Sequence, residues 1–198
     1  TFYQGGSVLA HGGQPLTQSV HLHTQARVDT MWAMSHAMQW DDAIVEDGVL
    51  RVTGSSQRFP YREHWELRPA GDDAFAFNVW FEALEPLDVQ EYNVSLGLRP
   101  EYTRWRTPHE AGAFPPFDPK DAEWRHLNRS YDPAGTVGAS ADSLPSVELE
   151  ATEDSGPFRM TLINTGYEQR TRVLQAIRIS EHGQGLHYEQ GRHLWFSG

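Results

Sequence analysis

Alternating apolar and polar residues between positions 48 and 98 are the feature that most constrains the fold of this chain. A period of two places successive side chains on opposite faces of a β-strand. The pattern falls into four runs bounded by turn-forming residues, which cover 49–53, 61–67, 75–82 and 90–98. Consecutive runs of this kind predict antiparallel strands with one buried and one solvated face.

The apolar positions of these runs supply the predicted core. In the second run, Tyr61, Trp65 and Leu67 share one face, with Arg62, His64 and Glu66 on the other. Residues 69–73 have the composition of a turn. The third run places Phe75, Phe77, Val79 and Phe81 together, and the last places Tyr92, Val94, Leu96 and Leu98 together.

Further alternating segments extend the strand pattern to both ends of the chain. We expect strands at 20–28, 147–151, 158–163, 170–179, 186–189 and 193–196. The total of about nine or ten strands predicts an all-β, antiparallel β-sandwich of jelly-roll-like form. A chain of 198 residues fits one such domain, so we expect residues 1–198 to fold as a single unit.

Three segments depart from this pattern. We expect residues 1–13 to form an arm or an edge strand. Met31, Met34 and Met38 are spaced as on one helix face, and Asp29-Thr30 is suited to cap a short helix there. Residues 99–146 contain seven prolines and many aromatic residues, which predicts a long, ordered loop packed over one sheet face.

Composition narrows the range of partners and cofactors. Lys and Arg total 16 against 27 Asp and Glu, and the resulting net charge of −11 disfavours nucleic acid and anionic membranes. No apolar run is long enough for a transmembrane span. Cysteine is absent, which excludes disulfides and thiolate chemistry. No nucleotide-binding or serine-hydrolase motif occurs, so we expect no cofactor; oligomeric state and compartment stay open.

His21 and His23 are the one pair whose spacing is typical of metal ligands. Residues two apart on a strand point the same way, so their two imidazoles could bind one ion. Cupins use such a pair. The cupin pattern, however, continues with a Glu and a later Pro-Gly-His element, and neither follows here. We therefore expect no bound metal, and histidines that face solvent or form hydrogen bonds.

The second run is the densest in groups capable of proton transfer. Glu63 falls on its apolar face, where burial raises the pKa of a carboxyl group and suits it to general acid catalysis, unless an Arg pairs with it at the sheet edge. The stretch from His64 to Arg68 resembles, over five residues, the strand that lines the groove of jelly-roll alginate lyases. It lacks that motif's first Arg, and the family's other motifs are absent. The candidate proton-transfer groups are Glu63, His64, His109, Glu110 and His126.

Aromatic and arginine side chains suggest a ligand surface. Trp80, Trp105 and Trp124 stand between polar or charged neighbours, as aromatic plates that hold sugar rings do. Arg62, Arg170 and Arg172 are candidate clamps for carboxylates or sulfates. The alternatives are packing of the loop onto the sheet for the tryptophans, and cross-strand pairing with Glu for the arginines.

Three functions from different classes fit these features. The first is a domain that binds or degrades a polysaccharide through an aromatic groove, as a binding module, a polysaccharide lyase or a glycoside hydrolase. The second is a lipocalin-like closed barrel that binds, isomerises or cyclises an apolar small molecule. The third is an interaction domain without a ligand. An open groove with exposed Trp favours the first, and a closed apolar cavity favours the second.

Overall fold

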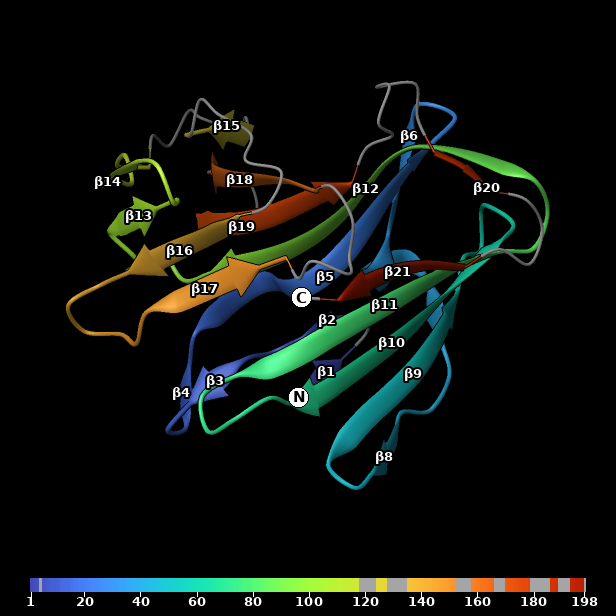
Figure 1. The fold of residues 1–198 in the computed structure, drawn as a ribbon, viewed down its shortest axis with the longest axis horizontal. Helices are drawn as coiled ribbons and strands as arrows, with labels where there is room; N and C mark the ends of the chain where they lie inside the picture. The colour runs from blue at the N-terminus through green and yellow to red at the C-terminus, as the bar shows by residue number, and fades with distance from the viewer. Residues whose placement is uncertain are drawn as a thin grey trace.

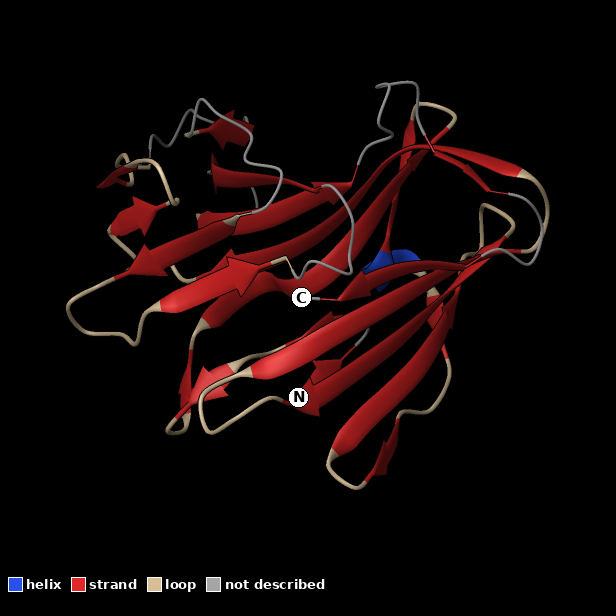
Figure 2. Ribbon diagram, viewed as in Figure 1, coloured by secondary structure: helices blue, strands red, loops and turns tan. Residues whose placement is uncertain are grey.

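The computed structural model describes residues 1–3, 5–117, 124–127, 135–151, 158–165, 170–178, 186–188 and 193–197. Strands dominate these segments (Figure 2), and a single 3-10 turn at Ser35–Ala37 is their only helical element. The strands pair antiparallel and form stacked sheets, so the predicted all-β, sandwich-like class is confirmed. Within the described segments, no helix has the length and apolarity required to cross a membrane.

The large sheet is built around three long antiparallel strands in the order β5-β12-β19. Leu96 of the central strand is opposite Leu22 on one side and Leu174 on the other. The members of this sheet are β1 (Phe2–Tyr3), β2 (Gly6–Ser7), β5 (Thr17–Val28), β6 (Met31–Met34), β12 (Leu87–Leu98), β15 (Trp124–His126), β18 (Phe158–Thr165), β19 (Thr171–Arg178) and β20 (Leu186–Tyr188).

The second sheet has the order β21-β11-β10-β9-β7, with β8 beside β9, and lies along the large sheet (Figure 1). Its members are β7 (Gln39–Trp40), β8 (Ile44–Glu46), β9 (Val49–Ser55), β10 (Tyr61–Pro69), β11 (Phe75–Ala83) and β21 (His193–Ser197). Aromatic contacts join the two sheets. The ring of Phe81 meets that of Tyr92 edge-on with centroids 5.7 Å apart, and both residues belong to one buried core.

A third, four-stranded sheet lies at one end of the large sheet (Figure 1). It contains β13 (Arg104–Arg106), β14 (Ala111–Ala113), β16 (Thr136–Ser140) and β17 (Val147–Glu150). Most of it falls within the predicted loop 99–146, so that segment contains strands the sequence did not predict. Pro108, Pro115, Pro116 and Pro145 lie between these strands, and Tyr102 and Phe114 anchor the segment in the core.

The alternating runs form the predicted strands, but they do not share one sheet. The first three are β9, β10 and β11 of the second sheet, whereas the fourth is β12 at the centre of the large sheet. At the N-terminus, where we expected an arm or edge strand, β1 and β2 join the large sheet and β3 (Ala10–His11) pairs with β4 (Gln14–Pro15). The described segments hold 21 strands, more than predicted, because two-residue strands show no alternation.

The helix expected after Asp29 is not formed, and this prediction is wrong. Asp29 and Thr30 have φ of 49° and 65°, and they make a two-residue turn that pairs Val28 with Met31. Two successive positive φ angles are typical of the type I′ hairpin turn, which matches strand twist. Pairing of β6 with β5 therefore overrides the helical spacing of the methionines.

The barrel geometry of the lipocalin-like alternative is also absent from the described segments. The large sheet ends in β1 and β15, and the second sheet ends in β21 and β7. These edges do not pair with one another, so the strands described here leave the sandwich open.

Candidate functional site

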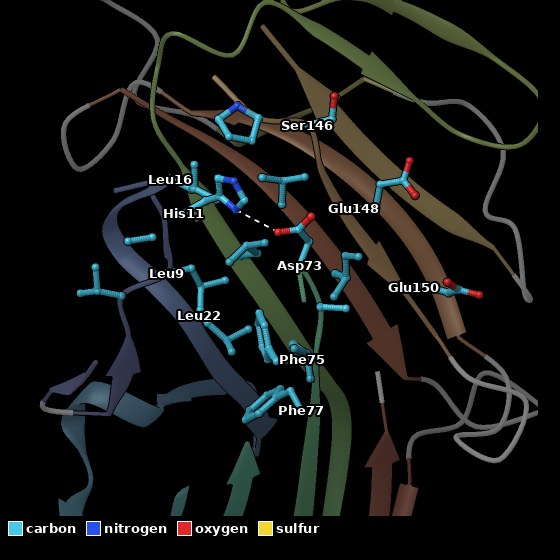
Figure 3. A pocket seen from close by; sticks show the side chains of 18 of the residues that line it. Leu9, His11, Leu16, Leu22, Asp73, Phe75, Phe77, Ser146, Glu148 and Glu150 are labelled. Carbon is cyan, nitrogen blue, oxygen red and sulfur yellow. Dashed lines mark ion pairs between the residues drawn. The ribbon is translucent and has the colours of Figure 1, made fainter. Parts of the chain in front are cut away.

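An open groove lies over the inner face of the large sheet, between the second and third sheets (Figure 3). Its floor comes from the central strands, with Leu22 on β5, Val94 and Leu96 on β12, and Ala176 on β19. Residues 72–77 form one wall, and residues 145–151 form the other. The segment that leads into the β3–β4 hairpin closes one end with Leu9.

The groove is large and mainly apolar. Its volume is about 1030 Å³, at the upper end of the range typical of small-molecule sites. Leu16, Phe77 and Leu149 face it along with the floor residues. Phe75, at the mouth, is 39% exposed. The floor residues Leu22, Val94, Leu96 and Ala176 are only 2–5% exposed, so they lie deep in the groove and Phe75 is its most exposed large apolar side chain. Burying such apolar surface in contact with a ligand is favourable.

Carboxylates form the rim of the groove. Asp73 stands on one wall, next to Asp72 in the chain, and Glu148 and Glu150 are the exposed positions of β17 on the other wall (Figure 3). The Glu148 carboxylate forms an ion pair with Arg106. His11 approaches Asp73, with 3.3 Å between Nδ1 and Oδ1, and both side chains are exposed. The rim therefore favours neutral or cationic polar groups over anionic ones.

The predicted residues His64, Trp80 and Arg62 are brought together, but on the outer face of the second sheet rather than in this groove. His64 is opposite Trp80 on β11, and Arg62 is opposite Glu82. The His64 Nε2 atom lies 2.9 Å from Glu82 Oε2, and its Nδ1 atom lies 3.0 Å from Thr53 Oγ1. A hydrogen-bonded row thus crosses three strands.

Glu63 lies on the opposite face of the same strand and is completely buried. Its Oε2 atom accepts hydrogen bonds from the Thr24 hydroxyl at 2.5 Å and from the Trp65 indole at 2.9 Å. Burial raises the pKa of Glu63, and these hydrogen bonds oppose that shift only in part. Burial on the apolar face and the raised pKa agree with the sequence-based expectation. The groove is lined by other residues, so Glu63 does not face it.

Two phenols complete the surroundings of this carboxyl group. Tyr61 and Tyr92 are buried, and their pKa values are raised well above the ordinary value, first by burial and then by the charge of Glu63. The Tyr92 phenol in turn lowers the pKa of Glu63. The cluster connects β10 to β5 and β12, and therefore stabilises the contact between the two sheets.

The arginines expected to form one clamp lie in different environments. Arg172 is only 5% exposed and donates from Nη1 to the Pro115 carbonyl at 2.7 Å. Its guanidinium lies over the rings of Phe114 and Phe117, with 4.9 and 3.8 Å to their centroids. Burial lowers the pKa of Arg172 to about 10. Arg170 is exposed, has a φ of 60° and precedes β19, so the predicted strand face shared by the two arginines is not present.

Trp105, His109 and Glu110 of the 99–146 segment do not line the groove. The indole of Trp105 donates to the Ala113 carbonyl at 3.2 Å and packs over Gly112, where a Cβ atom would meet the ring at 2.8 Å. His109 and Glu110 follow β13 in a turn organised by the Thr107 hydroxyl. Trp124 and His126 are in β15, but their side chains lie outside the described part of the structure.

His21 and His23 do not converge on a common point. His21 has a φ of 52°, and its Nδ1 atom lies 3.1 Å from Thr17 Oγ1. His23 is buried, with its Nδ1 atom 3.3 Å from the His21 carbonyl and its Nε2 atom 3.0 Å from the Gln25 amide. Across the described ranges, no cluster of three potential metal ligands occurs.

Sequence reasoning expected a groove between a sheet face and the 99–146 segment, but it missed most of the residues that line the observed groove. It treated residues 69–73 only as a turn, placed His11 in an arm, and assigned Phe75, which is 39% exposed, to the core. Phe77 does belong to the core, as expected, and it also lines the groove. The groove joins segments that are far apart in the chain, and no local pattern predicts that they meet. Thr53 and Glu82 were also missed, although alternation places them on the same face as His64.

Compared with models of known families, with curated proteins and with solved structures, the chain matches none. The functional argument therefore depends on the geometry of the groove and of the outer face alone.

Proposed function

We propose that this domain binds an amphipathic small molecule in the groove between the second and third sheets. The observation that carries the proposal is an open, mainly apolar groove of about 1030 Å³. The apolar part of the ligand lies on Leu22, Val94 and Leu96, and its polar end faces the rim. Burial of apolar area at about 25 cal/mol per Å² supplies the binding free energy.

The rim indicates the charge of the ligand. Asp72, Asp73, Glu148 and Glu150 belong to the two walls, Glu148 is paired with Arg106, and the whole chain carries a net charge of −11. An anionic head group would meet repulsion from both sources, whereas a neutral or cationic one would not. The proposed ligand is therefore an alkyl or aryl compound with a neutral or positively charged end.

Carbohydrate is a second candidate, and Phe75 is the observation that favours it. This ring is 39% exposed at the mouth, beside the carboxylates of Asp72 and Asp73. An aromatic face next to hydrogen-bond acceptors is suited to a sugar ring, whose faces are apolar and whose rim is polar. Here Phe75 takes the role that the sequence suggested for tryptophans.

The test is titration with Nile red, a neutral apolar dye whose emission increases in apolar surroundings. We expect saturable binding, and weaker binding by Val147→Trp, which fills part of the groove wall. A loss of about 60 Å² of apolar contact costs about 1.5 kcal/mol, or about tenfold in affinity. Val45→Trp is the matched control, because Val45 is 65% exposed on β8, away from the groove.

The outcomes separate the candidates. Equal dye affinity in Val147→Trp and Val45→Trp, with both variants folded, would contradict groove binding. Binding of soluble oligosaccharides that Phe75→Ala abolishes, without dye binding, would favour the carbohydrate candidate. If neither dye nor sugar binds, the interaction-domain hypothesis is favoured instead.

A further inference from the structure

We propose that Thr53, His64 and Glu82 form an acyl-transfer site on the outer face of the second sheet, with small carboxylic esters as substrates. This site is independent of the groove. The Thr53 hydroxyl, the His64 imidazole and the Glu82 carboxylate are joined in that order by contacts of 3.0 and 2.9 Å. A hydroxyl, a base and an orienting carboxylate in sequence is the arrangement that activates a nucleophile.

The hydrogen bonds fix the direction in which the proton moves. A carboxylate only accepts hydrogen bonds, so in the neutral imidazole the proton is on Nε2, facing Glu82. The Nδ1 atom is then an acceptor, and the Thr53 hydroxyl donates to it. The oxygen of Thr53 is therefore already hydrogen-bonded to the base that would take its proton.

Strand pairing holds this geometry. His64 is directly opposite Thr53 on β9, and Glu82 is on β11, the neighbour of β10 on the other side. Sites built on paired strands are held more rigidly than sites on loops. The side chains of His64 and Glu82 are 34% and 24% exposed, so the row is partly shielded yet accessible to a small reagent.

The same face carries a charge network that serves as a structural comparison. Glu66 accepts hydrogen bonds from Arg51 and Arg68, which pair their charges with a carboxylate that is itself buried. The row at His64 differs, because it ends in a hydroxyl group instead of a cation. Charge pairing accounts for Glu66, but it does not account for a threonine hydroxyl directed at an imidazole.

Arg62 provides a group to stabilise developing negative charge. It precedes His64 by two residues on β10, so it lies on the same face, opposite Glu82 in the register. Its exposed guanidinium makes no ion pair or hydrogen bond with another residue of the described segments. A guanidinium near the reacting carbon stabilises the oxyanion of a tetrahedral intermediate. Trp80, opposite His64, offers apolar surface to the acyl or alkyl part.

The reaction balances with the ester and water alone. The Thr53 oxygen forms a bond to the acyl carbon while its proton passes to His64, and the ester C–O bond then breaks. His64 returns the proton to the leaving alkoxide, which departs as an alcohol. Water attacks the acyl-threonine in the same way, which releases the carboxylic acid and restores the hydroxyl. Glu82 is a positioning residue that orients the imidazole throughout.

The test is reaction of the whole chain with p-nitrophenyl acetate, followed by mass spectrometry of the intact protein and of its peptides. We expect one acetyl group on Thr53. Thr53→Val removes it, and Thr53→Ser keeps it. His64→Gln slows its formation by at least about a hundredfold, the lower end of the contribution of general base catalysis. Ser55→Ala, at the next outward position of β9, is the matched control and leaves the rate unchanged.

The role of Glu82 is tested by comparing the acetylation rate with thermal stability, because a purely structural residue would not change the rate at unchanged stability. Glu82→Gln is expected to slow acetylation about tenfold or more while thermal unfolding stays the same, and Glu82→Asp to retain more of the rate. Acetyl groups spread over several hydroxyls at similar rates would overturn the proposal. So would acetylation of Thr53 at an unchanged rate in His64→Gln, or a stable label confined to His64.

Discussion

Glu63 and Glu66 lie three residues apart on β10, yet their pKa values shift in opposite directions. Glu63 faces the core, where burial raises its pKa. Burial also opposes ionisation of Glu66, but hydrogen bonds from Arg68 and Arg51 outweigh it and lower the pKa. The two faces of one strand therefore make opposite contributions to the pH dependence of stability.

At the scale of the single residue, we expect Glu63→Gln to change how stability varies with pH. A raised pKa in the folded state stabilises fully below the ordinary value of 4.5, and this contribution is lost as pH rises through the folded-state pKa. The wild-type free energy of unfolding should therefore fall relative to that of Glu63→Gln as pH increases, by at most about 1.4 kcal/mol per pH unit. Urea unfolding at a series of pH values measures this.

Glu66→Gln is the matched control, because the sign is reversed. A lowered pKa stabilises the fold above the ordinary value of 4.5, and that contribution is lost as pH falls through the folded-state pKa. Wild type should therefore lose stability relative to Glu66→Gln on acidification. A Glu63→Gln protein with the same pH slope as wild type would contradict our description of the buried cluster.

The sequence predicts part of this residue-level chemistry. Alternation places Glu63 inside and His64 outside, and the structure agrees. Their partners could not be predicted, because Thr24 and Glu82 lie on other strands whose register is unknown from sequence. Arg172 shows the limit of alternation, since it lies among the rings of Phe114 and Phe117, which belong to a distant segment.

At the scale of the element, the turn between β5 and β6 contains a residue with a strained backbone conformation. Thr30 has a φ of 65°, a region that β-branched residues rarely adopt. The turn is retained because β6 pairs with β5 over four residue pairs. A backbone hydrogen bond from the Thr30 amide to Gln90 Oε1, at 3.1 Å, also holds it.

Thr30→Gly is therefore expected to stabilise the protein. Glycine adopts this φ without steric strain and keeps the amide that donates to Gln90. The relief of about 1–2 kcal/mol is partly offset by glycine's larger entropy in the unfolded chain, leaving about 0.5–1 kcal/mol. Thr30→Ala is the control, since alanine keeps the strain, and chemical denaturation compares the two. Equal stability of both variants would show that the turn is not strained.

Elements with strong alternation were predicted well, and others were not. The strands from β9 to β12 and those near the C-terminus match the expected segments within a few residues. The spacing of the methionines indicated a helix, because local periodicity and composition contain no information on the pairing of β6 with β5. In the 99–146 segment, the prolines favoured the prediction of a loop. The short strands there form because they pair with one another, which the sequence does not show.

At the scale of the whole molecule, the groove is a product of topology. Its floor belongs to three strands of the large sheet, and its walls belong to two other sheets. The chain therefore brings together residues near positions 9, 75, 94, 147 and 176, which no sequence pattern connects. The fold class could be predicted from local alternation, whereas the groove required the arrangement of all three sheets.

Photolabelling with a dodecylammonium compound that carries a diazirine at the end of its alkyl chain tests the binding proposal most directly. The probe has an apolar chain for the groove floor and a cationic head for the rim. We predict saturable labelling of residues 72–77, 145–151 and the strand positions of the floor, and competition by Nile red. Labelling confined to the exposed edge strand β8, or spread evenly over the surface without saturation, would contradict the account.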